Sequence, residues 1–201
     1  MNLWKSRWLK PAVFLFCLAP LAVLAWLWYT RQLGINSVEF VARYTGRWTL
    51  RLLLLSLAIT PLRLFKPLSP LIQFRRMLGL MAFCYAMLHA FHYWAIDVQW
   101  DWAIIREDLT FRRFFIAGAA ALLLMVPLAA TSTDRAIRWM GGKRWRLLHR
   151  LAYVSAVLAV VHYLWQGKSW DMLPLIYAGV LGVLLLVRFG SYARKRWSTA
   201  L

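Results

Sequence analysis

Acidic residues and cysteines are scarce in this sequence of 201 residues, which has seven Asp or Glu and two Cys against 25 Lys or Arg. Both cysteines, Cys17 and Cys84, lie inside apolar runs, as small buried apolar residues do. No CxxC or CxxCH motif occurs, so an iron–sulfur cluster, a zinc knuckle and a covalently attached c-type haem all lack ligands. No glycine-rich phosphate loop follows a strand-like run, and no soluble nucleotide-binding domain is expected.

Charge is also low, at 16% of the residues, whereas about a quarter is usual in soluble domains. Hydrophobic residues make up 62%, and the 13 Trp, eight Tyr and 11 Phe are typical of aromatic belts at membrane interfaces. The composition indicates an all-α polytopic membrane protein with a single domain, residues 1–201. The net charge of +18 does not indicate nucleic acid as a partner, because the basic residues form short clusters between apolar runs, as membrane topology requires.

Six apolar runs are long enough to cross the roughly 30 Å hydrocarbon core of a bilayer. They cover about 11–29, 48–62, 77–96, 114–133, 147–165 and 172–187. The second is the least clean, because Arg51 lies in its first turn, and the sixth is short. The basic start of the chain resembles a signal peptide, but no small-residue cleavage site follows the first apolar run, so this run is expected to remain as a span. The sequence therefore predicts a six-helix bundle.

Lysine and arginine predict the orientation of the bundle, because cytoplasmic loops are enriched in them. With the N-terminus inside, the cytoplasmic segments contain most of the basic residues, namely Lys5, Arg7, Lys10, Arg63, Lys66, Arg75, Arg76, Arg135, Arg138, Lys143, Arg144, Arg146, Arg150, Arg188, Arg194, Lys195 and Arg196. The opposite side keeps Arg31, Arg43, Arg47, Arg51, Arg106, Arg112, Arg113 and Lys168. Both chain ends are expected in the cytoplasm. For a bacterial chain the far side is the periplasm, and the protein is expected to be a multi-pass protein of the inner membrane.

Two histidines on different predicted spans lie at matched depth. The third and fifth spans both run from inside to outside, with His89 twelve residues beyond Met77 and His162 twelve beyond Arg150. At about 1.5 Å per residue the two imidazoles reach the same level, in the outer half of the bilayer. Two imidazoles at one level can take both axial positions of one haem iron, giving a low-spin b-type site suited to single-electron transfer.

A structural role is the alternative, since polar side chains inside membranes often bond to backbone or hydroxyl groups of neighbouring helices. His149 lies about 20 Å before His162 along a helix, at the cytoplasmic edge, and is either a ligand for a second haem or a hydrated interfacial residue. Arg76 occupies the matching depth on the third span and cannot ligate iron. On an ideal helix His149 and His162 would point about 140° apart, so both could face inward only across a bulge or tilt. His92, one turn from His89, is expected to be structural or to support the ligand.

Haem propionates are carboxylates and need cationic partners. Arg47 and Arg51 lie at the outer end of the second span, at the level where an outer haem would present its propionates. The alternative for Arg51 is a side chain that snorkels to the interface. Arg76 is a third candidate partner for a propionate, on the cytoplasmic side.

The residues around these histidines resemble a known family. Trp145, Leu148, His149, Arg150, Leu151 and Tyr153, followed by His162-Tyr163-Leu164-Trp165, resemble the fifth helix of ferric-reductase-like transmembrane domains. More closely, the chain is similar to the haem-binding membrane subunits of bacterial periplasmic methionine-sulfoxide reductase systems. The matching stretches are Thr45-Gly46-Arg47, Ile59-Thr60-Pro61-Leu62, Arg75-Arg76-Met77-Leu78-Gly79-Leu80, Leu88-His89, Thr131-Ser132-Thr133, His162-Tyr163-Leu164-Trp165 and Pro174-Leu175-Ile176-Tyr177-Ala178-Gly179.

The resemblance implies an inner-membrane electron-transfer subunit that contains b-type haem and FMN. Its electrons would come from the quinone pool or a cytoplasmic flavin reductase and would pass to a periplasmic molybdenum-containing reductase that repairs oxidised methionines. His89, His149 and His162 fall on the histidine positions of the family. The chain departs from the related oxidases at Arg76, where their four-histidine arrangement has its remaining ligand. FMN is implied by the resemblance alone, because no residue pattern here identifies a flavin site.

A non-redox transporter or channel, with histidines in a proton or ion path, is the alternative function. Transporters often contain inverted repeats whose matching halves have helices broken by Gly or Pro. Pro20, Pro61, Pro127 and Pro174 form no such matched pair. The haem electron-transfer subunit is therefore favoured, and the catalytic reductase is expected to be a separate protein.

Overall fold

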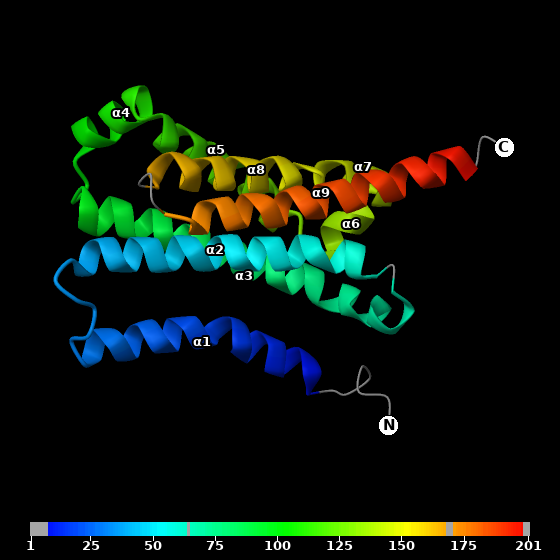
Figure 1. The fold of residues 1–201 in the computed structure, drawn as a ribbon, viewed down its shortest axis with the longest axis horizontal. Coiled ribbons are helices and arrows are strands. Elements are labelled where there is room, and N and C mark those ends of the chain that lie inside the picture. Colours follow the sequence, from blue (N-terminus) through cyan, green and yellow to red (C-terminus); the bar gives the residue numbers. More distant parts are fainter. Residues whose placement is uncertain (1–7, 64, 168–170, 199–201) are drawn as a thin grey trace.

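The computed structural model of the chain describes residues 8–63, 65–167 and 171–198, and its regular elements are all helices. The long helices that run back and forth in Figure 1 are α1 (Leu9–Tyr29), α2 (Ser37–Leu62), α3 (Ile72–His92), α5 (Arg113–Ala130), α8 (Leu151–Gln166) and α9 (Leu173–Ser198). Shorter elements connect them, namely η2 (Lys66–Leu71), the π-helical η3 (Tyr93–Asp97), α4 (Trp102–Phe111), α6 (Asp134–Met140) and α7 (Gly142–Leu148). The predicted all-helical class is confirmed.

The start of α1 and the end of α9 lie at the same end of the bundle (Figure 1). Arg75 and Arg76 at the start of α3, together with the arginines of α6 and α7, lie at this end too, and we call it the basic end. The other end, where α3 and α8 finish, is called the opposite end. Lys5, Arg7 and Lys168 of the predicted charge pattern lie outside the described residues, as do the side chains of Arg194, Lys195 and Arg196.

Five helical segments of the described residues are long and apolar enough to cross a membrane, which confirms a multi-pass membrane protein. They are Leu9–Tyr29, Lys66–Asp97, Arg113–Ala130, Gly142–Gln166 and Leu173–Ser191. The α2 helix, which contains the second predicted span, is not among them. It contains Glu39, Arg43, Arg47 and Arg51, and these charged side chains lower its hydropathy.

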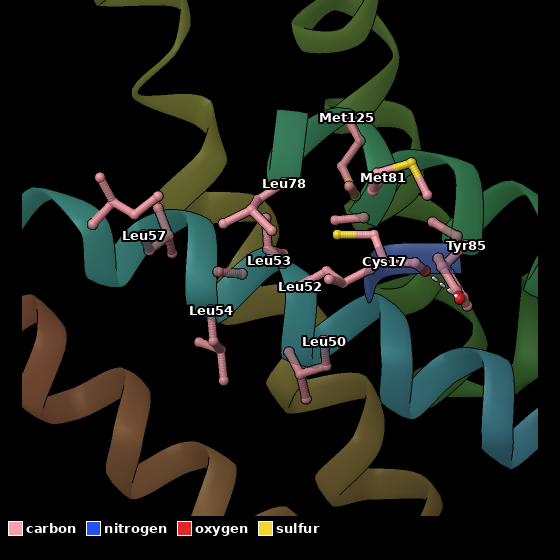
Figure 2. Packing of buried hydrophobic residues seen from close by; sticks show 14 of the residues in the cluster. Cys17, Leu50, Leu52, Leu53, Leu54, Leu57, Leu78, Met81, Tyr85 and Met125 are labelled. Carbon is pink, nitrogen blue, oxygen red and sulfur yellow. Dashed lines mark hydrogen bonds between the residues drawn. The ribbon is translucent and has the colours of Figure 1, made fainter. Parts of the chain in front are cut away.

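The α2 helix is nevertheless as long as its neighbours and provides much of the core. Leu50, Leu52, Leu53, Leu54 and Leu57 of α2 are all buried. Figure 2 shows these leucines beside Leu78 and Met81 of α3, Met125 of α5 and Cys17 of α1. Because other helices cover α2 on several sides, its side chains meet protein rather than lipid over much of their surface. A high hydropathy is therefore not needed for α2 to lie within the bundle.

Two hydroxyl groups attach α1 to the bundle. The fully buried Tyr85 of α3 donates its hydroxyl to the carbonyl oxygen of Cys17 at 2.8 Å (Figure 2), and Tyr44 of α2 donates to the carbonyl of Pro20 at 3.0 Å. Proline lacks the N–H of a normal helical residue and disturbs the hydrogen bonds of the turn before it. The two tyrosines thus give additional partners to helix carbonyls beside Pro20, in an environment where water is scarce.

The segment after α3 contains a helix that the apolar runs did not reveal. Asp101 caps α4 by accepting from the backbone N–H of Ala103 at 2.8 Å. Asp108 on α4 is only 2% exposed; it accepts the Tyr93 hydroxyl at 2.6 Å and pairs with Arg112 at 2.9 Å. These bonds fix α4 against η3 and the start of α5, because a buried carboxylate is stable only when it is paired and hydrogen-bonded.

The fifth predicted span, 147–165, is interrupted near its start. The helix α7 ends at Leu148, and His149 and Arg150 form a turn before α8 begins at Leu151. This break changes the direction of the His149 side chain relative to that of His162, which a continuous helix would separate by about 140°. Other helix ends also differ from the apolar runs: α2 begins at Ser37, where Asn36 accepts from the N–H of Glu39, and α9 continues to Ser198.

Candidate functional site

His89 of α3 and His162 of α8 lie next to each other near the opposite end of the bundle. Their ring centres are 6.2 Å apart and their planes are inclined by 78°. The two residues belong to different helix pairs: α3 packs closely against α2, and α8 packs closely against α5. The histidine pair therefore lies where these two helix pairs meet.

A backbone carbonyl determines the tautomer of each ring. His89 Nδ1 lies 3.0 Å from the carbonyl oxygen of Ala42 on α2, and His162 Nδ1 lies 2.7 Å from that of Phe114 on α5. A carbonyl oxygen only accepts hydrogen bonds, so each Nδ1 bears the proton and donates it. In a neutral imidazole the other nitrogen, Nε2, then keeps its lone pair. Metal-ligating histidines have this arrangement, with the far nitrogen oriented by a carbonyl or carboxylate.

A glycine on the neighbouring helix accommodates each imidazole. A Cβ added to Gly46 of α2 would lie 3.2 Å from Cε1 of His89, and one added to Gly118 of α5 would lie 2.6 Å from Nδ1 of His162. Both glycines stand four residues after the residue whose carbonyl accepts from the ring, Ala42 in one case and Phe114 in the other. Residues four apart share one helix face, so the two imidazoles are held in matching ways by α2 and α5.

The spacing of the rings fits two axial ligands of one metal ion. Imidazole nitrogen binds a first-row metal at about 2 Å, so two axial imidazoles on opposite sides of one ion have ring centres about 6 Å apart. The observed separation is 6.2 Å. No group of three or more His, Cys, Asp or Glu side chains that could hold a metal ion occurs in the part of the chain that the structure describes. The arrangement therefore suits a metal whose other ligands come from a cofactor, as the porphyrin nitrogens of haem do.

His92 and His149 have different environments from the pair. His92 donates from Nε2 to the carbonyl of Val38 at 2.9 Å, which ties α3 to the start of α2. His149 Nε2 lies 3.2 Å from Oγ1 of Thr131, whose own proton goes to the carbonyl of Pro127 at 2.6 Å. The Thr131 oxygen therefore accepts from His149, and the His149 ring also stacks on Trp145 at 3.9 Å.

The three arginines predicted to meet propionates have different contacts. Arg51 donates from Nε to the hydroxyl of Tyr177 on α9 at 2.8 Å, and its guanidinium lies 4.9 Å from the ring centre of Trp48. Arg47 donates from Nε to the carbonyl of Arg43 at 3.2 Å, one turn earlier on α2. Arg76 lies at the basic end and forms an ion pair with Asp134 of α6 at 2.6 Å. The structure thus separates Arg76 from the arginines of α2.

Three residues of the site were not predicted as site residues, namely Gly46, Gly118 and Tyr177. A glycine within an apolar run often marks a close approach of another group, and this signal was available for Gly118 but not for Gly46, which precedes the second run. Nothing in the spacing along the chain pairs Gly46 with His89 or Gly118 with His162, because each pair lies on two different helices. The contact between Arg51 and Tyr177 likewise depends on the packing of α2 against α9.

Residues 45–160 match the family described as ferric reductase like transmembrane component. This range includes His89, His149 and both site glycines and ends just before His162. The chain is 46% identical over 194 residues to a protein-methionine-sulfoxide reductase heme-binding subunit MsrQ of Rhodospirillum rubrum, covering 96% of this chain and 93% of that protein. Proteins of the same name from Polaromonas naphthalenivorans (41% over 204 residues, 96% and 93% covered) and Azospira oryzae (47% over 178 residues, 88% and 76% covered) are also similar.

Proposed function

The chain belongs to the ferric-reductase-like transmembrane family, and within it to the MsrQ haem-binding subunits of methionine-sulfoxide reductases; on this premise we propose that it transfers electrons across the bacterial inner membrane. The donor is the quinone pool or a cytoplasmic flavin reductase, and the acceptor is a periplasmic molybdenum-containing reductase, MsrP. That partner carries out the reduction of methionine sulfoxide, and this chain is its membrane electron-transfer subunit.

The observation that supports this proposal is the matched pair of imidazoles. His89 and His162 each commit Nδ1–H to a helix carbonyl and keep the Nε2 lone pair, with ring centres 6.2 Å apart. These two nitrogens are the ones we assign as axial ligands of one b-type haem. Bound there, the haem would supply reversible one-electron transfer.

The surrounding residues orient the ligands. The carbonyls of Ala42 and Phe114 prevent ring rotation, because turning an imidazole would leave its Nδ1 proton without an acceptor inside the bundle. The glycines Gly46 and Gly118 let α2 and α5 approach the rings closely. Ligands that are already oriented need little rearrangement when the charge of the site changes, which favours fast electron transfer.

We assign Arg47 and Arg51 of α2 to the haem propionates. Tyr177 already fixes the Nε of Arg51, and the two terminal nitrogens of that guanidinium remain available for a carboxylate. A charge-assisted bond of this kind would offset part of the cost of placing Arg51 within the apolar boundary. Arg76 is the third propionate partner predicted from the sequence. To bind a propionate at the basic end, it would have to break its ion pair with Asp134.

Electron entry is proposed at the basic end, where His149 lies. There His149 either ligates a second haem or helps to hold FMN or a quinone. Ligation through Nε2 would replace the hydrogen bond from this nitrogen to Thr131, whereas the other roles could keep it. In the topology that accompanies this proposal, six helices including α2 cross the membrane and both chain ends are cytoplasmic. The positive-inside rule supports the orientation, because the basic end has the larger share of arginine and lysine.

Visible spectroscopy and reconstitution test the proposal together. Protein purified in detergent after growth with a haem precursor should show the reduced α-band of a low-spin b-type haem. Combined with MsrP and a quinol or reduced flavin, it should support reduction of methionine sulfoxide in a peptide. A purified, folded protein without haem absorbance would contradict the cofactor assignment. Haem that is reduced but never reoxidised by MsrP and its substrate would contradict the partner.

A further inference from the structure

A second polar site lies at the basic end, between α8 and α9 and away from the histidine pair. An open cavity of about 380 Å³ is lined there by Arg150, Tyr153, Leu185, Arg188 and Phe189. Tyr153 is in the first turn of α8, and Arg188 of α9 lies beside it. None of these residues contributes to the site proposed for haem.

Two polar atoms of this cavity are covered but have no partner. The hydroxyl oxygen of Tyr153 and Nη1 of Arg188 are both buried and make no hydrogen bond. The guanidinium of Arg188 lies 4.5 Å from the centre of the Tyr153 ring, so the two side chains are in contact. An unsatisfied buried donor costs about 1–3 kcal/mol, and more when it is charged. Both groups can donate, so the missing partner is an acceptor.

The charge around the cavity is positive and uncompensated. Arg150 lines the cavity, and Arg75 and Arg150 are close enough to Arg188 to repel it. No acidic side chain lines it among the described residues, and Asp134, on the nearby α6, is already paired with Arg76. Cations at the edge of an apolar region are stable when an anion or water accompanies them. An anionic acceptor fits this positive lining better than a neutral one.

The apolar side of the cavity indicates where the anion comes from. Leu185 and Phe189 line it, Phe189 is 73% exposed, and the neighbouring Leu186 of the same helix is 72% exposed. Such exposed side chains on a membrane-crossing helix face lipid chains. An arginine-lined cavity beside an apolar, lipid-facing helix surface matches the two parts of a phospholipid, and basic pockets between helices on the cytoplasmic side bind anionic headgroups.

We propose that this cavity binds the headgroup phosphate of an anionic phospholipid, with Arg188 and Tyr153 donating to the phosphate and Leu185 and Phe189 contacting an acyl chain. The bound lipid would join α8 to α9 and neutralise part of the charge of Arg150 and Arg188. A phosphate ester such as FMN offers the same acceptor group, and the experiment below separates the two sources. This inference does not rest on the haem proposal.

Native mass spectrometry of the full chain, purified with its haem, can test the site with phosphatidylglycerol as the probe. The wild type should retain one phosphatidylglycerol under conditions that strip phosphatidylcholine, and this lipid should raise its thermal midpoint more than phosphatidylcholine does. Arg188→Gln should weaken this retention about tenfold and Tyr153→Phe about threefold, as expected for lost charge-assisted and neutral hydrogen bonds. Arg188→Lys keeps the charge and should weaken it less than Arg188→Gln. The haem spectrum should stay unchanged in all three variants.

Arg138→Gln on α6 is the matched control, because it removes one exposed arginine at the same end of the bundle and should retain the lipid as the wild type does. If Arg188→Gln and Arg138→Gln lose the lipid equally, general surface charge explains the binding and the proposed site is wrong. If micromolar FMN displaces phosphatidylglycerol from the wild type, the cavity binds a flavin phosphate instead, and the lipid assignment is wrong. Equal stabilisation by inorganic phosphate would make it a site for any small anion, which also overturns the lipid assignment.

Discussion

Gly118 of α5 lies so close to His162 of α8 that a Cβ added to the glycine would stand 2.6 Å from the ring nitrogen Nδ1. That nitrogen is the one that donates to the carbonyl of Phe114, one turn earlier on α5. The hydrogen bond that selects the tautomer of His162 and the absence of a side chain at position 118 are therefore two parts of one contact.

Gly118→Ala is expected to displace the His162 ring. Overpacking of this kind costs about 1–3 kcal/mol, so the variant should lose most of its haem and unfold at a lower temperature. Gly179→Ala on α9 is the matched control, because nothing lies within 4 Å of its added Cβ, and alanine is the better helix former by roughly 1 kcal/mol. The measurement is haem per protein by visible absorbance, with the thermal midpoint in detergent. Equal haem content in the two variants would contradict the proposed role of Gly118.

Removal of either axial ligand should abolish the low-spin haem. We expect His89→Ala and His162→Ala each to lose the reduced α-band, because one imidazole alone cannot complete a six-coordinate low-spin iron. His92→Ala is the control on the same helix. It removes a bond to the carbonyl of Val38 but no proposed ligand, so it should keep its haem. Haem loss in His92→Ala with retention in His89→Ala would mean that the wrong histidine of α3 was assigned.

Arg51→Gln is expected to lower the midpoint potential of the haem. Ferric haem has one more positive charge than ferrous haem, so a nearby cation favours the reduced form. Its removal should shift the potential on the order of 40 mV, or about 1 kcal/mol for one electron. Tyr177→Phe keeps the cation and loses only its hydrogen bond, so its shift should be smaller. A redox titration followed in the visible range measures both, and an unchanged potential in Arg51→Gln would indicate that this side chain snorkels away from the haem.

Reporter fusions can test the orientation of the bundle. Fusions within Arg135–Lys143 and after Ala200, which lies outside the described residues, should report the cytoplasm. A fusion near Asp101 should report the periplasm, because the connection before α4 lies at the end away from the basic residues. A periplasmic signal from the fusion after Ala200 would reverse the direction of electron transfer proposed above.

Loss of His149 should slow the entry of electrons more than their exit. His149→Ala should retain the haem of His89 and His162, because that pair lies near the other end of the bundle. Quinol or reduced flavin should then reduce this haem slowly in stopped-flow measurements, while turnover started with dithionite should stay near the wild-type rate. Thr131→Val is a milder comparison, since it removes the hydroxyl that accepts from His149. Equal slowing of both reactions in His149→Ala would place this residue on the exit side.

Some features of the site could be predicted from local patterns, whereas others depended on contacts between helices. The matched depth of His89 and His162 follows from the fixed rise of about 1.5 Å per residue, so counting from the ends of two spans was enough to predict it. That the two rings lie 6.2 Å apart depended on how the helices pack. The turn at His149 and Arg150 could not be predicted in this way, because the apolar pattern continues through it. The α4 helix was not predicted, and only the burial of Asp108 against Tyr93 shows why it is stable beside the bundle.

The sequence by itself determined the helical membrane class, since long apolar runs in a bilayer must satisfy their backbone hydrogen bonds internally. It also placed two imidazoles at one depth. Only the tertiary structure decided which nitrogen of each ring is free, because the carbonyls of Ala42 and Phe114 come from helices distant in the chain. The close approach of Gly46 and Gly118 and the cavity beside Arg188 were decided in the same way. The physical reason is that apolar periodicity specifies which residues can enter a membrane, whereas side-chain packing between particular helices specifies which atoms meet there.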